Sequence, residues 1–263
     1  MTKIIVTLVI TTLMLSFVNA QSEETKVAKP VLIDKDALSG IGLQKIDLKD
    51  EPEKDFYQKK LFGGEEISVF VVSTETWNNK ISSYSFDEYV YLLNGQSIVK
   101  AQQGPTEVFN SGEHLFMPKG FVGEWEIRAG SNLHYELSVI TSKRADPSKT
   151  SKDLSYGAIE NSKLSGCQIN FEESDVYEEV LRSGVELTIH LKAEKPREQS
   201  NFESPQEQLI HILSGKLELT DTEGTNYTFY TGDFFVLPLG RFKKNWKSNG
   251  HGMLKYLVIE KSK

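Results

Sequence analysis

Cysteine is almost absent from this chain, because Cys167 is the only one among 263 residues. A framework of intramolecular disulfides is therefore excluded, and the folded protein has to be stabilised by packed cores. An excess of positive charge is also lacking, since 30 Lys and Arg residues stand against 37 Asp and Glu residues. The acidic balance argues against nucleic acid or an anionic membrane surface as a partner.

A long apolar run occurs only at the N-terminus. Lys3 precedes an apolar segment of 15 residues, 4–18, and the tripeptide VNA ending at Ala20 has the small-x-small pattern of a cleavage site. We expect residues 1–20 to be a signal peptide, so that the mature chain begins at Gln21 and is exported to the bacterial periplasm or the extracellular medium. The alternative is a membrane anchor, but a bilayer needs roughly 20 apolar residues. We therefore expect no membrane span in the mature chain.

Helical periodicity is scarcely visible, and short β-branched runs take its place. They come in pairs, one member in each half of the chain: Ile67–Val72 with Leu187–Leu191, and Tyr89–Leu93 with Leu209–Leu213. The second pair runs into Asn94-Gly95 and Ser214-Gly215, turn dipeptides that precede further alternating strands, Gln96–Lys100 and Lys216–Thr220. The sequence therefore predicts an all-β fold.

The two halves of the chain are copies of one unit. A shift of 120 residues aligns them without a gap from about Asp55 to Gly120. Identical pairs include Gly64 and Gly184, Glu66 and Glu186, Gly95 and Gly215, Phe109 and Phe229, Gly112 and Gly232, Pro118 and Pro238, and Gly120 and Gly240. Many of them are Gly or Pro, which turns select for backbone geometry. Two domains of the same fold are the simplest interpretation.

The spacing of these residues resembles the two motifs of the cupin family, G-x5-H-x-H-x3,4-E-x6-G and G-x5-P-x-G-x2-H-x3-N. Glu88 stands seven residues before Gly95, and the second motif is matched by Gly112, Pro118 and Gly120 and again by Gly232, Pro238 and Gly240. The segments DEYVYLLNGQ and SGEHLFMPKGFVGEWEI are similar to the ureidoglycine aminohydrolase-type cupin domain. The resemblance implies two tandem antiparallel cupin barrels of the jelly-roll kind.

The domain boundaries follow from the repeat and from composition. Residues 55–142 form cupin domain 1 and residues 166–263 form cupin domain 2. The linker between them is placed at 143–165, because its first part is polar, charged and contains a proline. Residues 21–54 are of mixed character, and we expect them to lie across a barrel as an N-terminal arm.

The resemblance also names the positions at which cupins hold a metal, usually with three His and one Glu. Those positions are occupied by Ser82, Tyr84, Glu88 and Gly123 in the first copy and by Phe202, Ser204, Gln208 and Lys243 in the second. Glu88 alone is a good ligand for a divalent ion, and one carboxylate without imidazoles is a poor transition-metal site. We therefore predict no metal and no other cofactor, which leaves open whether the protein is an enzyme.

An organic pocket in the first barrel is the remaining candidate site. Strand parity places Tyr84, Phe86 and Glu88 on one face of their strand, and it places Trp125 on the same side as position 123, where the metal ligand is missing. Glu88 is the candidate catalytic residue, as a general acid or base, or it holds a ligand together with the three aromatic residues. The alternative is that Glu88 makes a structural hydrogen bond inside a filled barrel.

The second barrel offers less chemistry in its sequence, and we interpret it as structural. Arg241 and Lys243-Lys244 provide an alternative, a basic rim that receives an anionic group.

The histidines do not supply a replacement site. His114 and His190 align with phenylalanines of the other copy and are interpreted as ordinary strand positions, and His211 has the opposite strand parity to Gln208. The sequence does not place His134 or His251.

Three functions remain open at this point. The first is an exported bicupin that binds a small molecule without a catalytic metal. The second is a hydrolase, aminohydrolase or isomerase acting on a small polar metabolite, which the cupin resemblance implies. The third is a structural or interaction protein, and a homodimer formed through strand edges belongs to this possibility.

Overall fold

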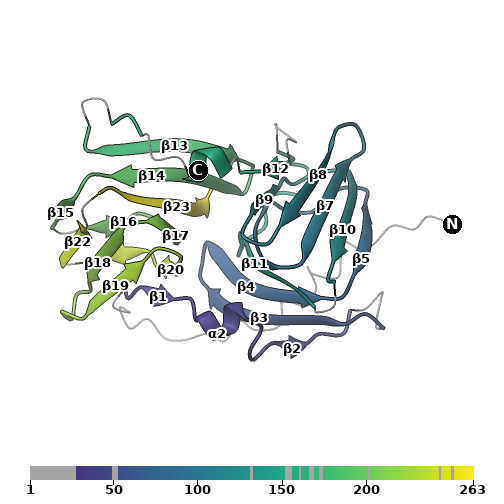
Figure 1. The fold of residues 1–263 in the computed structure, drawn as a ribbon, viewed down its shortest axis with the longest axis horizontal. Helices are drawn as coiled ribbons and strands as arrows, with labels where there is room; N and C mark the ends of the chain where they lie inside the picture. The colour runs from purple at the N-terminus through teal and green to yellow at the C-terminus, as the bar shows by residue number, and fades with distance from the viewer. Residues whose placement is uncertain are drawn as a thin grey trace.

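The computed structural model contains two β-barrel lobes joined face to face (Figure 1). It describes residues 28–48, 53–130, 133–151, 156–159, 161–165, 169–171, 174–200, 202–242, 244–249 and 252–263. The expected signal peptide, Cys167, Lys243 and His251 lie outside these residues. Within them, no helix has the length and apolar character that crossing a membrane requires.

The first barrel is built from two antiparallel sheets. Its strands are β3 (Phe56–Gly63), β4 (Ile67–Thr74), β5 (Trp77–Ile81), β6 (Glu88–Asn94), β7 (Gln96–Ala101), β8 (Thr106–Asn110), β9 (His114–Met117), β10 (Gly123–Arg128) and β11 (His134–Thr141). The larger sheet has the order β12-β9-β6-β11-β4-β3-β2, where β12 is Gly157–Ala158 and β2 is Gln44–Lys45, and the smaller has the order β5-β10-β7-β8.

The second barrel repeats this arrangement. Its strands are β13 (Val176–Ser183), β14 (Leu187–Glu194), β15 (Arg197–Gln199), β16 (Glu203–Ser204), β17 (Gln208–Ser214), β18 (Lys216–Thr220), β19 (Asn226–Tyr230), β20 (Phe234–Leu237), β21 (Gly240–Arg241), β22 (Lys244–Asn249) and β23 (Leu254–Lys261). The sheet orders are β1-β20-β17-β23-β14-β13, where β1 is Val31–Leu32, and β15-β22-β18-β19, with β16 and β21 as a separate pair. The predicted all-β fold of two antiparallel barrels is confirmed.

Strand alternation divides the apolar residues among three cores. In β4 and β14 the odd-numbered residues, such as Val69 and Ile189, belong to a core that contains residues of both barrels. The even-numbered residues of β4, such as Phe70, face the interior of the first barrel, which has its own core. A third core fills part of the second barrel around Phe235 and Trp246. The two lobes are therefore joined by buried apolar surface between their larger sheets.

The segments that precede the two barrels are exchanged between them. Strand β1 (Val31–Leu32), in the N-terminal arm, pairs with β20 of the second barrel, and β12 (Gly157–Ala158), in the linker, pairs with β9 of the first. A short helix follows each strand, α2 (Lys35–Leu38) and α3 (Asn161–Ser165). Figure 1 shows β1 in the lobe of the second barrel and β12 beside the first. The arm and the linker are thus equivalent parts of the repeat.

A reciprocal pair of carboxylates fastens the barrels together. Asp87 accepts hydrogen bonds from the backbone N–H groups of Glu186 and Leu187, in the turn between β13 and β14. Glu207, at the equivalent position of the second copy, accepts hydrogen bonds from the N–H groups of Glu66 and Ile67, in the turn between β3 and β4. Each barrel therefore holds the first hairpin turn of the other.

These carboxylates explain the glycine shared by the two turns. A Cβ atom at Gly64 would lie 2.0 Å from a carboxylate oxygen of Glu207, and one at Gly184 would lie 2.0 Å from a carboxylate oxygen of Asp87. The identical pair Gly64 and Gly184 is thus required by the contact between the barrels.

Four rings mark the local two-fold axis between the barrels. Tyr91 and His211, which are 120 residues apart, meet edge to face with centroids 5.3 Å apart. His211 stacks on Phe234 at 3.8 Å, and His114, the repeat equivalent of Phe234, lies 4.8 Å from Tyr91. Contact between equivalent residues places the axis at this cluster.

Candidate functional site

Glu88 forms a closed hydrogen-bond network inside the first barrel. The side chain is 7% exposed, and its two oxygens accept hydrogen bonds from Tyr84 Oη and Ser138 Oγ. Burial raises the pKa of Glu88 to about 7, and Glu136 adds to the rise, whereas the hydrogen bonds from Ser138 and Tyr84 oppose it. A carboxyl with this pKa exchanges a proton near neutral pH.

The residues predicted to surround Glu88 are brought together. The ring of Tyr84 lies 4.7 Å from that of Phe86 and 6.0 Å from that of Trp125, and all three side chains are buried. Trp125 Nε1 donates to Ser97 Oγ. They pack into the core of the first barrel.

The start of the linker covers this group. The guanidinium of Arg144 lies over the ring of Phe86, 4.0 Å from its centroid, and 3.8 Å from Glu186 Oε2. Lys119 Nζ donates to the carbonyl oxygens of Ala145 and Asp146. The linker is therefore held against the first barrel by buried charges.

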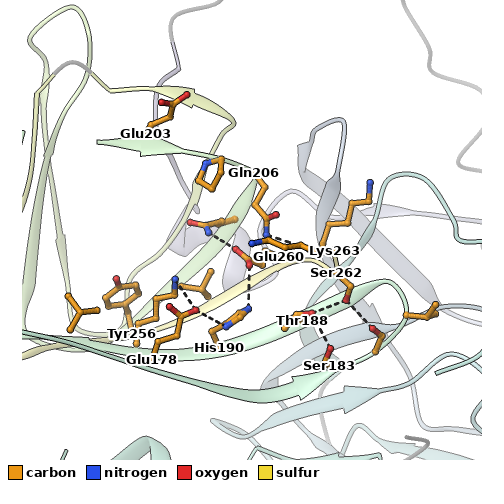
Figure 2. Close-up of a pocket in the computed structure, with 18 of the residues that line it drawn as sticks. Glu178, Ser183, Thr188, His190, Glu203, Gln206, Tyr256, Glu260, Ser262 and Lys263 are labelled. Atoms are coloured by element: carbon orange, nitrogen blue, oxygen red, sulfur yellow. Dashed lines mark hydrogen bonds and ion pairs between the residues drawn. The ribbon is translucent and has the colours of Figure 1, made fainter. Parts of the chain in front are cut away.

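An open cavity of about 1140 Å³ lies in the second barrel (Figure 2). Its walls come from β13, β14, β17, β22 and β23, and its rim comes from the linker and from the turn after β13. The polar lining side chains used below are Glu178, His190, Lys192, Glu194, Arg197, Gln208 and Glu260, and the aromatic ones are Phe202, Trp246 and Tyr256.

A histidine between two carboxylates forms one wall of this cavity. His190 Nδ1 lies 3.0 Å from Glu178 Oε1, and His190 Nε2 lies 3.3 Å from Glu260 Oε1. Nδ1 has no hydrogen-bond partner among the described residues, so its contact with Glu178 is a close approach rather than a hydrogen bond. Gln208 Nε2 donates to Glu260 Oε2. Figure 2 shows Glu178, His190 and Glu260 in contact along the wall.

Hydrogen bonds keep one of these carboxylates ionised. Burial alone would raise the pKa of Glu260, but hydrogen bonds from His190, Gln208 and Gln206 hold it below its usual value. The wall therefore presents a carboxylate, an imidazole and an amide that are fixed by one another.

A second polar group lies around Glu194. This buried carboxylate accepts hydrogen bonds from Arg197 Nε, Trp246 Nε1 and Tyr256 Oη, at 2.8, 3.1 and 2.6 Å. Burial and the charge of Glu194 raise the pKa of Tyr256 well above its usual value. The ring of Phe202 lies 4.8 Å from that of Trp246. A fixed carboxylate thus orients the cationic and aromatic side chains beside it.

The two barrels differ because their inward-facing residues differ in polarity. Phe70 and Val72 of β4 are replaced by His190 and Lys192 of β14, and Ile140 of β11 is replaced by Glu260 of β23. The apolar set packs into the core of the first barrel, whereas the polar set lines the cavity of the second.

This cavity bears on two sequence-based interpretations. His190 lies on the cavity wall between two carboxylates, and the interior of the second barrel, interpreted from the sequence as structural, contains charged groups around open space. The signal was present in the sequence, because every second position of 188–194 is polar (Thr188, His190, Lys192 and Glu194) and these residues line the barrel interior. The rim residues Arg241 and Lys244 are described by their backbone alone.

Three other histidines, His114, His134 and His211, have structural partners. The opposite parity of His211 and Gln208 is confirmed, because Gln208 lines the cavity while His211 stacks on Phe234 between the barrels. His114 Nδ1 lies 2.8 Å from Tyr89 Oη, and His134 Nε2 lies 2.7 Å from Glu136 Oε2. None of these three imidazoles faces the cavity.

The cupin metal positions contain little that binds an ion. Ser82 is exposed, and a Cβ atom at Gly123 would lie 2.2 Å from the carbonyl oxygen of Lys100, so no side chain fits there. Phe202 packs beside Trp246, and Ser204 Oγ donates to the carbonyl oxygen of Gln206. Across the described ranges, no three His, Cys, Asp or Glu side chains are grouped as metal ligands.

Comparison with known proteins assigns the family. The model of the EutQ-like cupin domain matches residues 69–135 and 181–256, one segment in each barrel and together more than half of the chain. The chain belongs to the EutQ-like cupin family. No curated protein matches this cupin significantly in sequence.

Solved structures share the tandem cupin fold. A protein of unknown function of the DUF861 family from Pseudomonas syringae pv. tomato str. DC3000 has a TM-score of 0.63 and 15% identity, with 88% of this chain and 99% of that chain covered. A cupin 2 conserved barrel domain protein from Leptotrichia buccalis has a TM-score of 0.57 and 12% identity, with 90% and 98% covered. The salicylate 1,2-dioxygenase of Pseudoaminobacter salicylatoxidans has a TM-score of 0.55 and 10% identity, with 89% and 82% covered. Such identities show the fold alone.

Proposed function

We propose that this tandem cupin binds a small polar molecule in the cavity of its second barrel, without a catalytic metal, after export from the cytoplasm. The wall formed by Glu178, His190 and Glu260 carries the proposal, because it lines an open cavity of about 1140 Å³. Ligand sites are concave and contain a few polar groups in fixed positions.

The energetics of burial support this choice of barrel. An ion pair in a barrel interior contributes little to stability, and well-packed apolar residues often do as well or better. At the position where the second barrel has His190, the first barrel has the apolar residue Phe70, which packs in its core. Polar residues that face open space in only one copy are therefore better explained by a ligand than by stability.

A thermal-shift screen of small polar metabolites tests this function. The protein is screened after treatment with EDTA and again with added Mn²⁺, Fe²⁺, Ni²⁺ or Zn²⁺. We expect compounds that raise the melting temperature equally well with and without metal. Stabilisation that appears only when a metal is added would show that the metal-free part of the proposal is wrong.

A second candidate function is acid–base catalysis at Glu88. The pKa of about 7 favours it, because a general acid or base works best when its pKa lies near the operating pH. The substrate would be a small polar metabolite and the reaction hydrolysis, removal of an amino group or isomerisation, as the cupin resemblance implies. If Glu88→Gln retains full turnover of a substrate found in the screen, this candidate is excluded.

A further inference from the structure

The charges that line the cavity of the second barrel nearly cancel, because four carboxylates stand beside five basic side chains: Glu178, Glu194, Glu203 and Glu260, and Lys149, Lys192, Arg197, Lys261 and Lys263. Glu178 lies 3.3 Å from Lys192 Nζ, Glu194 lies 2.8 Å from Arg197 Nε, and Glu260 lies 3.3 Å from His190 Nε2. Every one of these three carboxylates has a basic partner on the same wall or on the next strand. A ligand with a net charge of either sign would meet like charges as well as opposite ones.

After these contacts, the wall still has both free hydrogen-bond donors and a free acceptor. The described residues give Lys192 Nζ one ion pair, although an ammonium group has three donors. They also leave the terminal nitrogens of Arg197 and the Oε1 acceptor of Gln208 without a protein partner. A hydroxyl group both donates and accepts, so it can pair with any of these atoms.

Aromatic rings lie beside the polar groups. Phe202 is partly exposed, its ring centroid lies 4.8 Å from that of Trp246, and the interplanar angle is 33°. The ring centroid of Tyr256 also lies near that of Trp246, at 5.7 Å. The C–H face of a saturated ring packs well on such a surface while its hydroxyls reach the polar wall.

We propose that the ligand of this cavity is a neutral polyhydroxylated ring compound, a monosaccharide or a cyclic polyol. Its hydroxyls bind the ion pairs of the wall seen in Figure 2, and its C–H face packs on Phe202 and Trp246. This ligand class rests on the proposed function of the second barrel.

Isothermal titration of the purified protein tests the ligand class. The probes are glucose, galactose, mannose and myo-inositol, with glucuronic acid and glucosamine as charged analogues of the same ring. We expect a neutral member to bind roughly tenfold more tightly than either charged analogue, because only the charged analogues place an extra charge beside a wall whose charges nearly cancel.

Two variants at neighbouring positions locate the binding. Glu178→Gln removes a carboxylate from the cavity and is expected to weaken binding of the neutral ligand roughly tenfold. Glu179→Gln makes the same change one residue later, on the opposite face of β13, where Glu179 pairs with Lys163 and Tyr177. This control is expected to leave the affinity unchanged.

The outcomes separate the two proposals. Tighter binding of glucuronic acid or glucosamine, or no binding of any neutral member at millimolar concentration, overturns the ligand class. If a charged analogue binds and Glu178→Gln weakens its binding, the cavity is still a ligand site and only the class is wrong. If Glu178→Gln and Glu179→Gln bind every ligand as wild type does, the second barrel is not the site and both proposals fail.

Discussion

The same strand position carries an acid in one barrel and an amide in the other, Glu88 and Gln208. Because the folded pKa of Glu88 is raised from 4.5 to about 7, the folded state binds more protons than the unfolded state in this interval. The contribution of Glu88 to the free energy of unfolding is therefore fully present below pH 4.5, and it is lost as the pH rises from 4.5 through 7. The total loss is roughly 3 kcal/mol at most.

Glu88→Gln removes this pH dependence, because the amide resembles the protonated acid in shape and does not ionise. We expect the melting temperature of the variant to rise relative to wild type between pH 5 and pH 8. Scanning calorimetry of both proteins over this range checks it, and a constant difference between them would mean that Glu88 is ionised in the fold throughout. If Glu88 instead belongs to a ligand site, the variant melts as wild type does but binds the ligand roughly tenfold or more weakly.

The two histidines between the barrels titrate in the opposite sense. Burial lowers the pKa of His114 to about 3, with His211 contributing, and burial lowers the pKa of His211 to about 4, opposed by Asp233. Below pH 6.5 the unfolded state therefore binds more protons than the folded state. As the pH is lowered from 6.5, the free energy of unfolding decreases until the pH falls below the folded-state pKa values of about 3 and about 4. We expect the free energy of unfolding, measured with urea, to decrease less for His211→Phe than for wild type when the pH is lowered from 6.5 to 4. Equal losses would contradict a neutral, buried His211.

At the scale of elements, the reciprocal turns hold the barrels in register. Asp87 accepts hydrogen bonds from three backbone N–H groups, those of Lys119, Glu186 and Leu187, and its removal leaves them without an acceptor. We expect Asp87→Ala to reduce the free energy of unfolding by roughly 3 kcal/mol or more, and Glu207→Ala to act similarly. Glu65→Ala is the control, since its side chain is exposed in the same kind of turn. If Asp87→Ala and Glu207→Ala each reduce the free energy of unfolding by less than about 1 kcal/mol, which is the size of a surface contact, this role would be refuted.

Strand patterns predicted the positions of these elements well, and the contents of the barrels less well. The β-branched runs at 67–72 and 187–191 became β4 and β14, and the parity of Gln208 and His211 was correct. The cavity was not predicted, because Glu178, His190 and Glu260 lie outside the cupin metal positions. Whether inward polar residues pair across a barrel depends on the pairing of β13, β14 and β23, which single strands do not reveal.

At the scale of the whole molecule, the 120-residue repeat predicted two matched barrels, but not the exchange of their leading segments. The strands β1 and β12 have two residues each, too short for a periodic signal, and their partners lie in the opposite copy. The exchange ties the N-terminal arm to the second barrel and the linker to the first. Export and a homodimer remain predictions that this architecture does not test.

The central claim is that the second barrel, and not the first, contains the ligand site. It is tested most directly by measuring the ligand-induced shift in melting temperature for wild type, His190→Phe and Glu88→Gln, with a compound that stabilises the wild type. His190→Phe installs the residue that the first barrel has at this position, so the fold tolerates it there. We expect His190→Phe to lose most of the shift and Glu88→Gln to keep it. A shift that survives in His190→Phe and disappears in Glu88→Gln would contradict the account and place the site in the first barrel.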